Sequence, residues 1–200
     1  MGPSGSGKST LVHCINGMVP FSYPGESSGT LTVGGKDPAK TGIFGMSKIV
    51  GTVLQDTDGQ FIGLTVAEDV AFALENDCVE QEEMFRAVDE VAEVVDIKAL
   101  LGNAPTELSG GQKQRVSMAG VLVDDVDILL FDEPLANLDP ATGKRAIDLI
   151  DRICRERHKT VIIIEHRLED ALYRDVDRIV VIGDGRVVAD MTPDELLASD

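Results

Sequence analysis

The stretch Gly2-Pro3-Ser4-Gly5-Ser6-Gly7-Lys8-Ser9, followed by Thr10, fits the pattern G-x-x-x-x-G-K-[ST]. Its glycines let the backbone curl so that successive N–H groups point at phosphate oxygens, and the helix that follows adds its positive end. In such a loop Lys8 reaches the β- and γ-phosphates, and the Ser9 hydroxyl ligates Mg²⁺. The alternative is a glycine-rich turn that matches by chance. The full pattern is specific enough to favour a phosphate-binding loop.

A strand with two acids at its end lies further along the chain. The apolar run Ile128-Leu129-Leu130-Phe131 leads directly into Asp132 and Glu133. Beside a phosphate-binding loop, the first carboxylate of such a pair holds Mg²⁺, and the second orients and polarises the water that attacks the γ-phosphate. Apolar strands ending in acids are common in proteins. The loop upstream is what favours the catalytic interpretation here.

A third segment, Leu108-Ser109-Gly110-Gly111-Gln112, opens a helix with exposed N–H groups and a hydroxyl at its positive end. Alone it is equally well an ordinary capped helix start. Together with the loop and the Asp-Glu strand, in this order, it resembles the ATP-binding cassette (ABC) ATPases. The resemblance runs through essentially the whole chain. It implies a P-loop NTPase fold that binds ATP and Mg²⁺.

The resemblance also assigns roles to residues that mean little alone. Gln55 matches the Q-loop glutamine, which senses Mg²⁺ and the γ-phosphate and couples to the transmembrane partner. Leu108 to Gln112 match the signature motif, of which Ser109 and Gly111 contact the γ-phosphate of ATP bound to the opposite cassette; Ser109, Gly110, Gly111 and Gln112 are the expected nucleotide-binding residues. Asp139, at the end of Leu135-Ala136-Asn137-Leu138-Asp139, matches the D-loop aspartate that crosses the dimer interface, and His166 matches the switch histidine. The expected catalytic residues are thus Glu133, His166 and Gln55, and the expected metal ligands are Ser9, Gln55 and Asp132.

Three stretches are similar to the ATPases of energy-coupling factor (ECF) transporters, which import vitamins and transition-metal ions. They are residues 54–61, with the glutamines Gln55 and Gln60, residues 65–72, and residues 165–170. Thr57 stands where proline is usual in that subfamily. The likeness is greatest to tandem ECF ATPases with two cassettes in one polypeptide. It implies as partners a second ABC ATPase domain (identical, different or fused), a transmembrane coupling protein and a substrate-binding membrane component.

The alternation of strands and helices predicts an α/β fold with a largely parallel sheet. The pattern predicts one ABC ATPase domain over residues 1–200, interrupted by a helical subdomain at residues 65–123. A capping box at Thr65 and Glu68 marks the first helix of that subdomain. The predicted strands are 30–33, 49–54, 127–131, 160–164, 178–182 and 186–190; the predicted helices are 65–76, 81–96, one after Ser109, and 140–157.

The acidic composition bears on partners and compartment. Asp and Glu number 35 against 18 Lys and Arg, a formal net charge of −17, which disfavours nucleic acid as a partner. Three scattered cysteines (Cys14, Cys78, Cys154) indicate free thiols in a reducing compartment. No apolar run approaches the ~18 residues of a membrane span. We expect a cytoplasmic protein held at the inner face of the membrane by its transporter partner.

The resemblance also leaves expectations and alternatives open. ABC ATPases carry strands and an adenine-stacking aromatic before the phosphate loop, so a cassette truncated at its N-terminus is expected. One alternative is therefore a non-catalytic fragment that keeps the motifs. Another is a soluble ABC switch acting on DNA or the ribosome. That second alternative is disfavoured because only 54 positions separate Gln55 from Ser109, too few for a long coiled coil.

Overall fold

The structure is a computed structural model of the chain. It describes residues 1–55, 58–136, 138–166, 169 and 172–198. Six residues of the motif stretches above lie outside these described residues: Asp56, Thr57, Asn137, Arg167, Leu168 and Asp170.

The centre of the fold is a three-stranded parallel sheet of β1 (Val50–Val53), β2 (Ile128–Asp132) and β3 (Thr160–Ile164), in the order β1-β2-β3. Parallel neighbours need crossover connections, and helices supply them here. Because the strands are parallel, their carboxyl ends meet at one edge of the sheet. Glu133 directly follows β2 at that edge, and Gln55 and His166 each lie two residues beyond the ends of β1 and β3. The expected α/β fold with a parallel sheet is confirmed.

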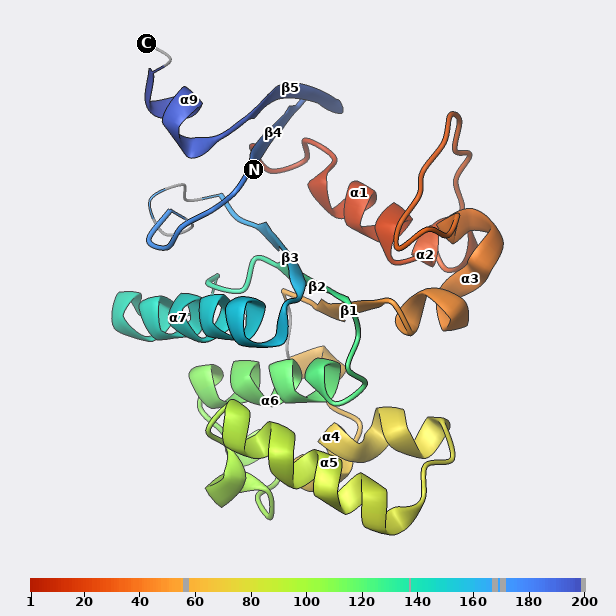
Figure 1. Cartoon of the computed structure of the whole chain (residues 1–200), viewed down its shortest axis with the longest axis vertical. Coiled ribbons are helices and arrows are strands. Elements are labelled where there is room, and N and C mark those ends of the chain that lie inside the picture. Colours follow the sequence, from red (N-terminus) through yellow and green to blue (C-terminus); the bar gives the residue numbers. More distant parts are fainter. Residues whose placement is uncertain (56–57, 137, 167–168, 170–171, 199–200) are drawn as a thin grey trace.

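Alternation along β2 divides the core between the two faces of the sheet. Leu129 and Phe131 pack into the larger cluster with side chains of α6 (Gly110–Leu122) and α7 (Pro140–Arg157). Leu130 points to the opposite face and packs with Val12 of α1 (Lys8–Ile15). Figure 1 shows α6 and α7 on one side of the strands and α1 on the other. Helices therefore cover both faces of β2, and Leu130 packs α1, the helix that follows the phosphate loop, against the sheet.

Between β1 and β2 the described residues form helices and contain no strand. The capping box is present: the Thr65 hydroxyl accepts from the Glu68 N–H at 3.2 Å, and the Glu68 carboxylate accepts from the Thr65 N–H at 3.1 Å. α6 lies between the sheet and the α4/α5 pair (Figure 1). The bounds 65–123 of the subdomain stay a prediction. The elements here are η1 (Asp58–Gln60), α4 (Val66–Asn76), α5 (Gln81–Val94), η2 (Lys98–Leu100), η3 (Pro105–Glu107) and α6.

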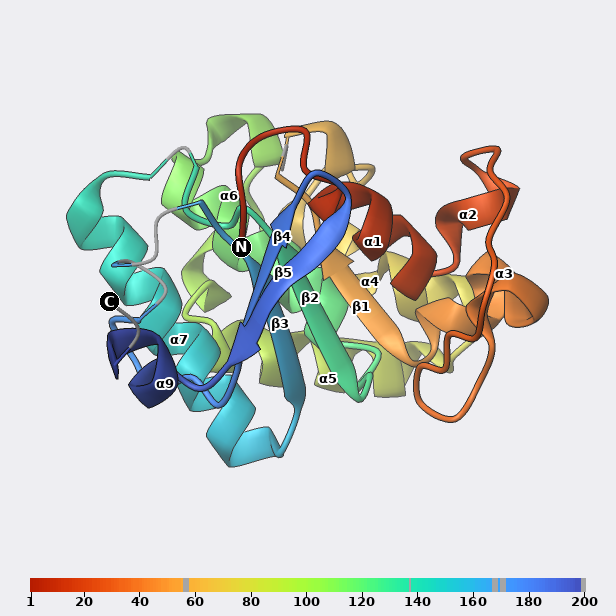
Figure 2. The same cartoon turned by 90° about the horizontal axis from the view of Figure 1, so that it is seen from above.

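A separate antiparallel hairpin pairs β4 (Ile179–Gly183) with β5 (Arg186–Met191), and α9 (Pro193–Ala198) follows it. Its two-residue turn has positive φ at Asp184 (49°) and Gly185 (71°), as a tight type I′ hairpin turn requires. Met1 lies against β4, where its amino group donates to the Val180 carbonyl and its own carbonyl accepts from the Ile182 N–H, both at 2.7 Å. The phosphate loop therefore begins on this hairpin, as Figure 2 shows.

The remaining segments follow α1. They contain α2 (Met18–Phe21) and α3 (Pro38–Ser47). The expectation of a strand at 30–33 is wrong: only Val33 bridges to Lys36 across the turn at Gly34 and Gly35. A short hairpin with no further strand beside it is at best marginally stable. No helix among the described residues has the length and the apolar character that crossing a membrane requires.

Candidate functional site

The phosphate loop is held against its own first residues and against β4. Lys8 is 5% exposed, and its ammonium donates to the carbonyls of Gly2 (3.0 Å) and Pro3 (2.9 Å). A Cβ on Gly2 would lie 2.0 Å from the Ile182 carbonyl oxygen, so this close approach requires glycine. Of the other predicted loop residues, Ser4, Gly5 and Gly7 lie in the loop, Ser9 and Thr10 are exposed in the first turn of α1, and Ser6 is buried.

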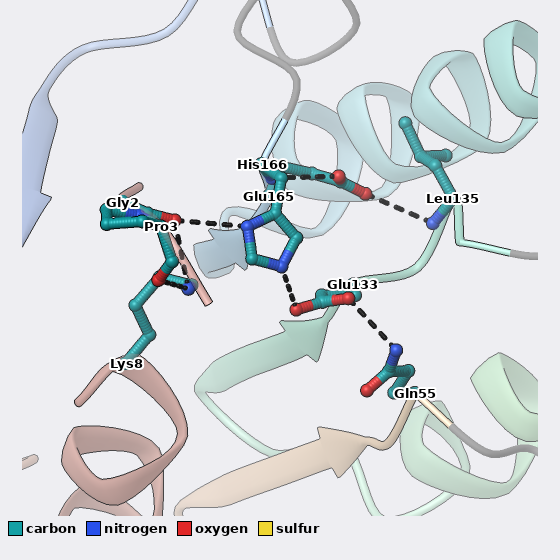
Figure 3. Close-up of polar contacts among 8 residues, drawn as sticks. All are labelled: Gly2, Pro3, Lys8, Gln55, Glu133, Leu135, Glu165 and His166. Atoms are coloured by element: carbon teal, nitrogen blue, oxygen red, sulfur yellow. Dashed lines mark hydrogen bonds and ion pairs between the residues drawn. The ribbon is translucent and has the colours of Figure 1, made fainter. Parts of the chain in front are cut away.

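A chain of polar contacts runs across the three strand ends to the loop (Figure 3). The Gln55 amide donates to Glu133 Oε2 at 3.0 Å, and His166 Nε2 contacts Glu133 Oε1. His166 Nδ1 lies 3.0 Å from the Gly2 carbonyl oxygen. Both partners of the ring are acceptors, so the imidazolium form satisfies both contacts by donating from each nitrogen. The structure therefore brings together the three residues expected to be catalytic and joins them to the loop.

Glu133 has a strained backbone, with φ at 49°. Such a conformation persists only where the surroundings hold it. The Glu133 N–H donates to the Ile164 carbonyl of β3 at 3.0 Å. From α6, the Gln114 amide donates to the carbonyl of Pro134, the residue that follows Glu133. The Glu133 carboxylate thus lies on a turn fixed from two sides.

Two buried polar residues were not singled out from the sequence. Gln114 (4% exposed) and Glu165 (3% exposed) both contact the turn that follows Glu133. For Glu165 the sequence does carry a signal: an acid that directly follows the apolar strand 160–164 and directly precedes His166. For Gln114 it carries none, because a glutamine on a helix is ordinarily exposed.

Asp132 fits the role of a metal ligand. It is buried, and its Oδ1 has no hydrogen-bond partner. Burial, with the charge of Glu133 beside it, raises the pKa of Asp132, while the Ser9 hydroxyl opposes that rise. A buried, unpaired carboxylate oxygen next to a serine hydroxyl and a lysine is a donor set that Mg²⁺ with phosphate would satisfy. No cluster of three or more His, Cys, Asp or Glu suited to a metal exists among the described residues, so phosphate oxygens and water would complete the shell.

The signature segment lies at a different place in the molecule. Ser109, Gly110, Gly111 and Gln112 line a cleft of about 670 Å³ between α6 and α7, together with Asp139. None of residues 2–10 lines this cleft. A Cβ on Gly111 would lie 2.7 Å from the Thr142 side chain, so glycine lets the start of α6 approach α7 closely. Within one chain, the two predicted phosphate sites are separate.

Asp139 and Ser109 each cap a helix. The Asp139 carboxylate accepts from the N–H groups of Ala141 (3.0 Å) and Thr142 (3.1 Å) at the start of α7. Hydrogen bonds, first of all those from Thr142, lower the pKa of Asp139. Ser109 forms a capping box with Gln112 at the start of α6. As local structure, the signature segment is therefore a capped helix start. This capping role is compatible with a role in binding phosphate.

Gln60 and Phe61 both contact the rest of the fold. Gln60 accepts a hydrogen bond from the Leu54 N–H at 3.2 Å, and Phe61 packs against the larger core cluster. Both contacts pack this segment onto the fold, so they account for Gln60 and Phe61 structurally.

Comparison with known proteins identifies the family. The family model described as ABC transporter matches residues 1–136. The chain is a member of the ABC transporter family. ABC transporter ATP-binding proteins of Photobacterium profundum and Clostridium perfringens are 62% and 63% identical to this cassette over its whole length. The cassette spans about a third of the length of these curated relatives, namely 36% and 35%.

Among solved structures, the cassette is similar to cbiO1 from Clostridium perfringens, described as part of the ABC transporter complex cbiONQ. The TM-score is 0.88 at 34% identity, over all of this chain and 78% of the other. This likeness agrees with the resemblance to ECF ATPases found in the sequence.

Proposed function

We propose that this ABC cassette binds ATP at the carboxyl edge of its sheet and hydrolyses it to ADP and phosphate. The observation that carries the proposal is the contact chain from Gln55 through Glu133 and His166 to the phosphate loop. An ordinary solvated carboxylate has no need of two fixed partners. Here Gln55 and His166 orient both oxygens of Glu133, and the loop beside them carries the buried cation Lys8.

In the proposed reaction, Glu133 accepts a proton from water as the water oxygen bonds to the γ-phosphorus and the bond to the leaving ADP oxygen breaks. Gln55 and His166 orient the Glu133 carboxylate, and protonated His166 contributes positive charge near the developing negative charge. Lys8 exchanges the carbonyls of Gly2 and Pro3 for phosphate oxygens. Each of these groups already lies within the contact network of this edge.

Ser9 and Asp132, with Gln55, would hold Mg²⁺. When bound there, the ion supplies charge that offsets the negative charge of the phosphates. The orphaned Oδ1 of Asp132 supports this assignment, because a cation relieves the cost of that buried oxygen.

The proposal includes a partner cassette. The phosphate loop and the signature segment of one chain do not share a cleft, so a nucleotide that contacts both takes the loop from one cassette and Ser109 to Gln112 from the other. Asp139 lies in the same cleft as the signature and is then close to the interface. ATP closes such a head-to-tail pair, and hydrolysis opens it. The second cassette is identical, different or fused to the first.

We further propose that the cassette energises an ECF-type importer of vitamins or transition-metal ions, at the inner face of the membrane. The likeness to cbiO1 supports the transporter class. Exposed apolar side chains next to the Q-loop support a membrane partner: Ile62 is 64% exposed and Leu64 is 82% exposed. A transmembrane coupling protein and a substrate-binding membrane component complete the proposed complex.

The test of ATP hydrolysis is phosphate release by the purified protein with ATP and Mg²⁺. Saturable release that Lys8→Ala abolishes supports the proposal, whereas release unchanged by that substitution contradicts it. For the transport role, the tagged protein is purified from detergent-solubilised membranes of its source. Recovery with two different integral membrane proteins is expected. Recovery with none contradicts the ECF assignment.

A further inference from the structure

A buried carboxylate lies beside the proposed site without any role in it. Glu165 is 3% exposed and stands between the end of β3 and His166. Burying an ionised carboxylate is costly unless hydrogen bonds to the charged form offset the cost. An apolar side chain would fill this buried position at a lower free-energy cost. Packing alone therefore does not explain a glutamate here.

The two oxygens of Glu165 accept from two different parts of the site (Figure 3). Oε1 accepts from the Leu135 N–H at 3.1 Å, and Oε2 accepts from the His166 N–H at 3.3 Å. Leu135 belongs to the turn after β2, two residues beyond Glu133. The Glu165 carboxylate thus connects the backbone of His166 to the backbone of Leu135. Leu135 belongs to the turn that carries Glu133, the proposed base.

The turn after β2 is where such a connection has consequences. Glu133 is in a left-handed conformation that glutamate rarely adopts. Its N–H is already bonded to Ile164 of β3, and Glu165 fixes the same turn two residues later. Without the second attachment, relaxation at Glu133 would move its carboxylate relative to the His166 ring. Displacements of about 1 Å at reacting groups are enough to slow catalysis by about two orders of magnitude.

We propose that Glu165 is a positioning residue for ATP hydrolysis, whose buried carboxylate holds Glu133 and His166 in register by bonding the backbones of Leu135 and His166. The inference rests on the proposed function, since it concerns the same reaction. Glu165 touches neither nucleotide nor water in this scheme. It acts through Glu133 and His166.

The test is Glu165→Gln. Glutamine has nearly the same size but presents an amide NH₂ to one of the two N–H groups, so one hydrogen bond becomes a contact between two donors. We expect kcat to fall about tenfold to 100-fold, as for loss of alignment at a catalytic base. We expect the Kd for ATP, measured by calorimetry, to stay within about twofold, because the phosphate loop is untouched.

Glu195→Gln is the matched control. Glu195 also accepts from a backbone N–H, that of Thr192 at 2.8 Å, but on the exposed start of α9 away from the site. The control is expected to keep kcat and Kd, and the thermal midpoints of the two variants are compared. A fall in kcat alone, at a midpoint near that of the control, supports a positioning role. Loss of kcat, ATP affinity and thermal midpoint together reveals a structural role and overturns the inference.

Two further outcomes separate this inference from the function beneath it. Hydrolysis by Glu165→Gln within about twofold of the unaltered protein overturns the inference alone. No hydrolysis by the unaltered protein overturns the proposed function, and the inference with it. If Glu165→Gln does not fold, Glu165→Asp, which keeps the charge and shortens the reach by one methylene, is judged by the same criteria. Failure of both variants to fold assigns Glu165 a structural role and contradicts the proposal.

Discussion

Replacement of Glu133 by glutamine separates the chemistry of this site from its stability. The carboxylate accepts from the Gln55 amide and contacts His166 Nε2. The glutamine amide can remake both contacts. Its oxygen accepts from Gln55, and its NH₂ donates to Nε2 of a neutral His166 ring that keeps its Nδ1–H on the Gly2 carbonyl. With no buried polar group left unpaired, the free energy of unfolding should change by less than about 1 kcal/mol.

Catalysis by Glu133→Gln should change far more than stability, because an amide cannot accept the proton of the attacking water. Loss of a positioned base costs about 10² to 10⁴ in rate, or about 3 to 5.5 kcal/mol of transition-state stabilisation. The assay is steady-state phosphate release with saturating MgATP, beside urea unfolding of both proteins. A variant that retains more than about a tenth of the rate would refute the role of Glu133. A variant destabilised by several kcal/mol would refute the re-pairing of its contacts.

The remaining predictions concern the loop, the metal ligand and a helix cap. Lys8→Ala removes two charge-assisted hydrogen bonds to phosphate, worth about 3 kcal/mol together, so the calorimetric Kd for ATP should weaken about 100-fold; an unchanged Kd would place the nucleotide elsewhere. Burial raises the pKa of Asp132 above 3.8, so ionising it opposes folding, and the free energy of unfolding of the unaltered protein should decrease as pH rises from 3.8 through the raised value. Asp132→Asn should remove that decrease. In the absence of Mg²⁺ at neutral pH, it should also stabilise the protein by about 1 kcal/mol in urea unfolding, while abolishing hydrolysis. A variant less stable than the unaltered protein would contradict this prediction. Asp139→Ala should cost about 1 kcal/mol by uncapping α7, whereas Asp139→Asn should keep most of the cap; equal urea midpoints would show that the cap contributes nothing.

The parts of the fold that follow from apolar runs and from helix-capping residues were predictable from the sequence. Apolar runs of the kind at 128–132 and 160–164 form strands wherever helices cover both faces, and Thr65 with Glu68 fixes the start of α4 by a local hydrogen-bond exchange. The predicted helix at 81–96 ends at Val94 instead, because Asp96 adopts a positive φ of 57°. The predicted strand at 30–33 failed because a strand needs a partner, and local pattern does not say whether one exists.

The candidate site was predictable where each residue follows a strand end. Gln55, Glu133 and His166 meet because three parallel strands end at one edge, which the element order implies. The support beneath them was not predictable. Gln114 and Glu165 reach the turn after Glu133 through burial and backbone contacts, and neither depends on a spacing that a motif would show.

Calorimetric titration of ATP with Mg²⁺ into the purified protein tests whether the phosphate loop is the nucleotide site. Saturable binding of about one ATP per chain is expected, weakened about 100-fold by Lys8→Ala and unaffected by Glu195→Gln. Binding that is undetectable at millimolar ATP, or that Lys8→Ala leaves unchanged, would contradict the claim that this loop is the nucleotide site.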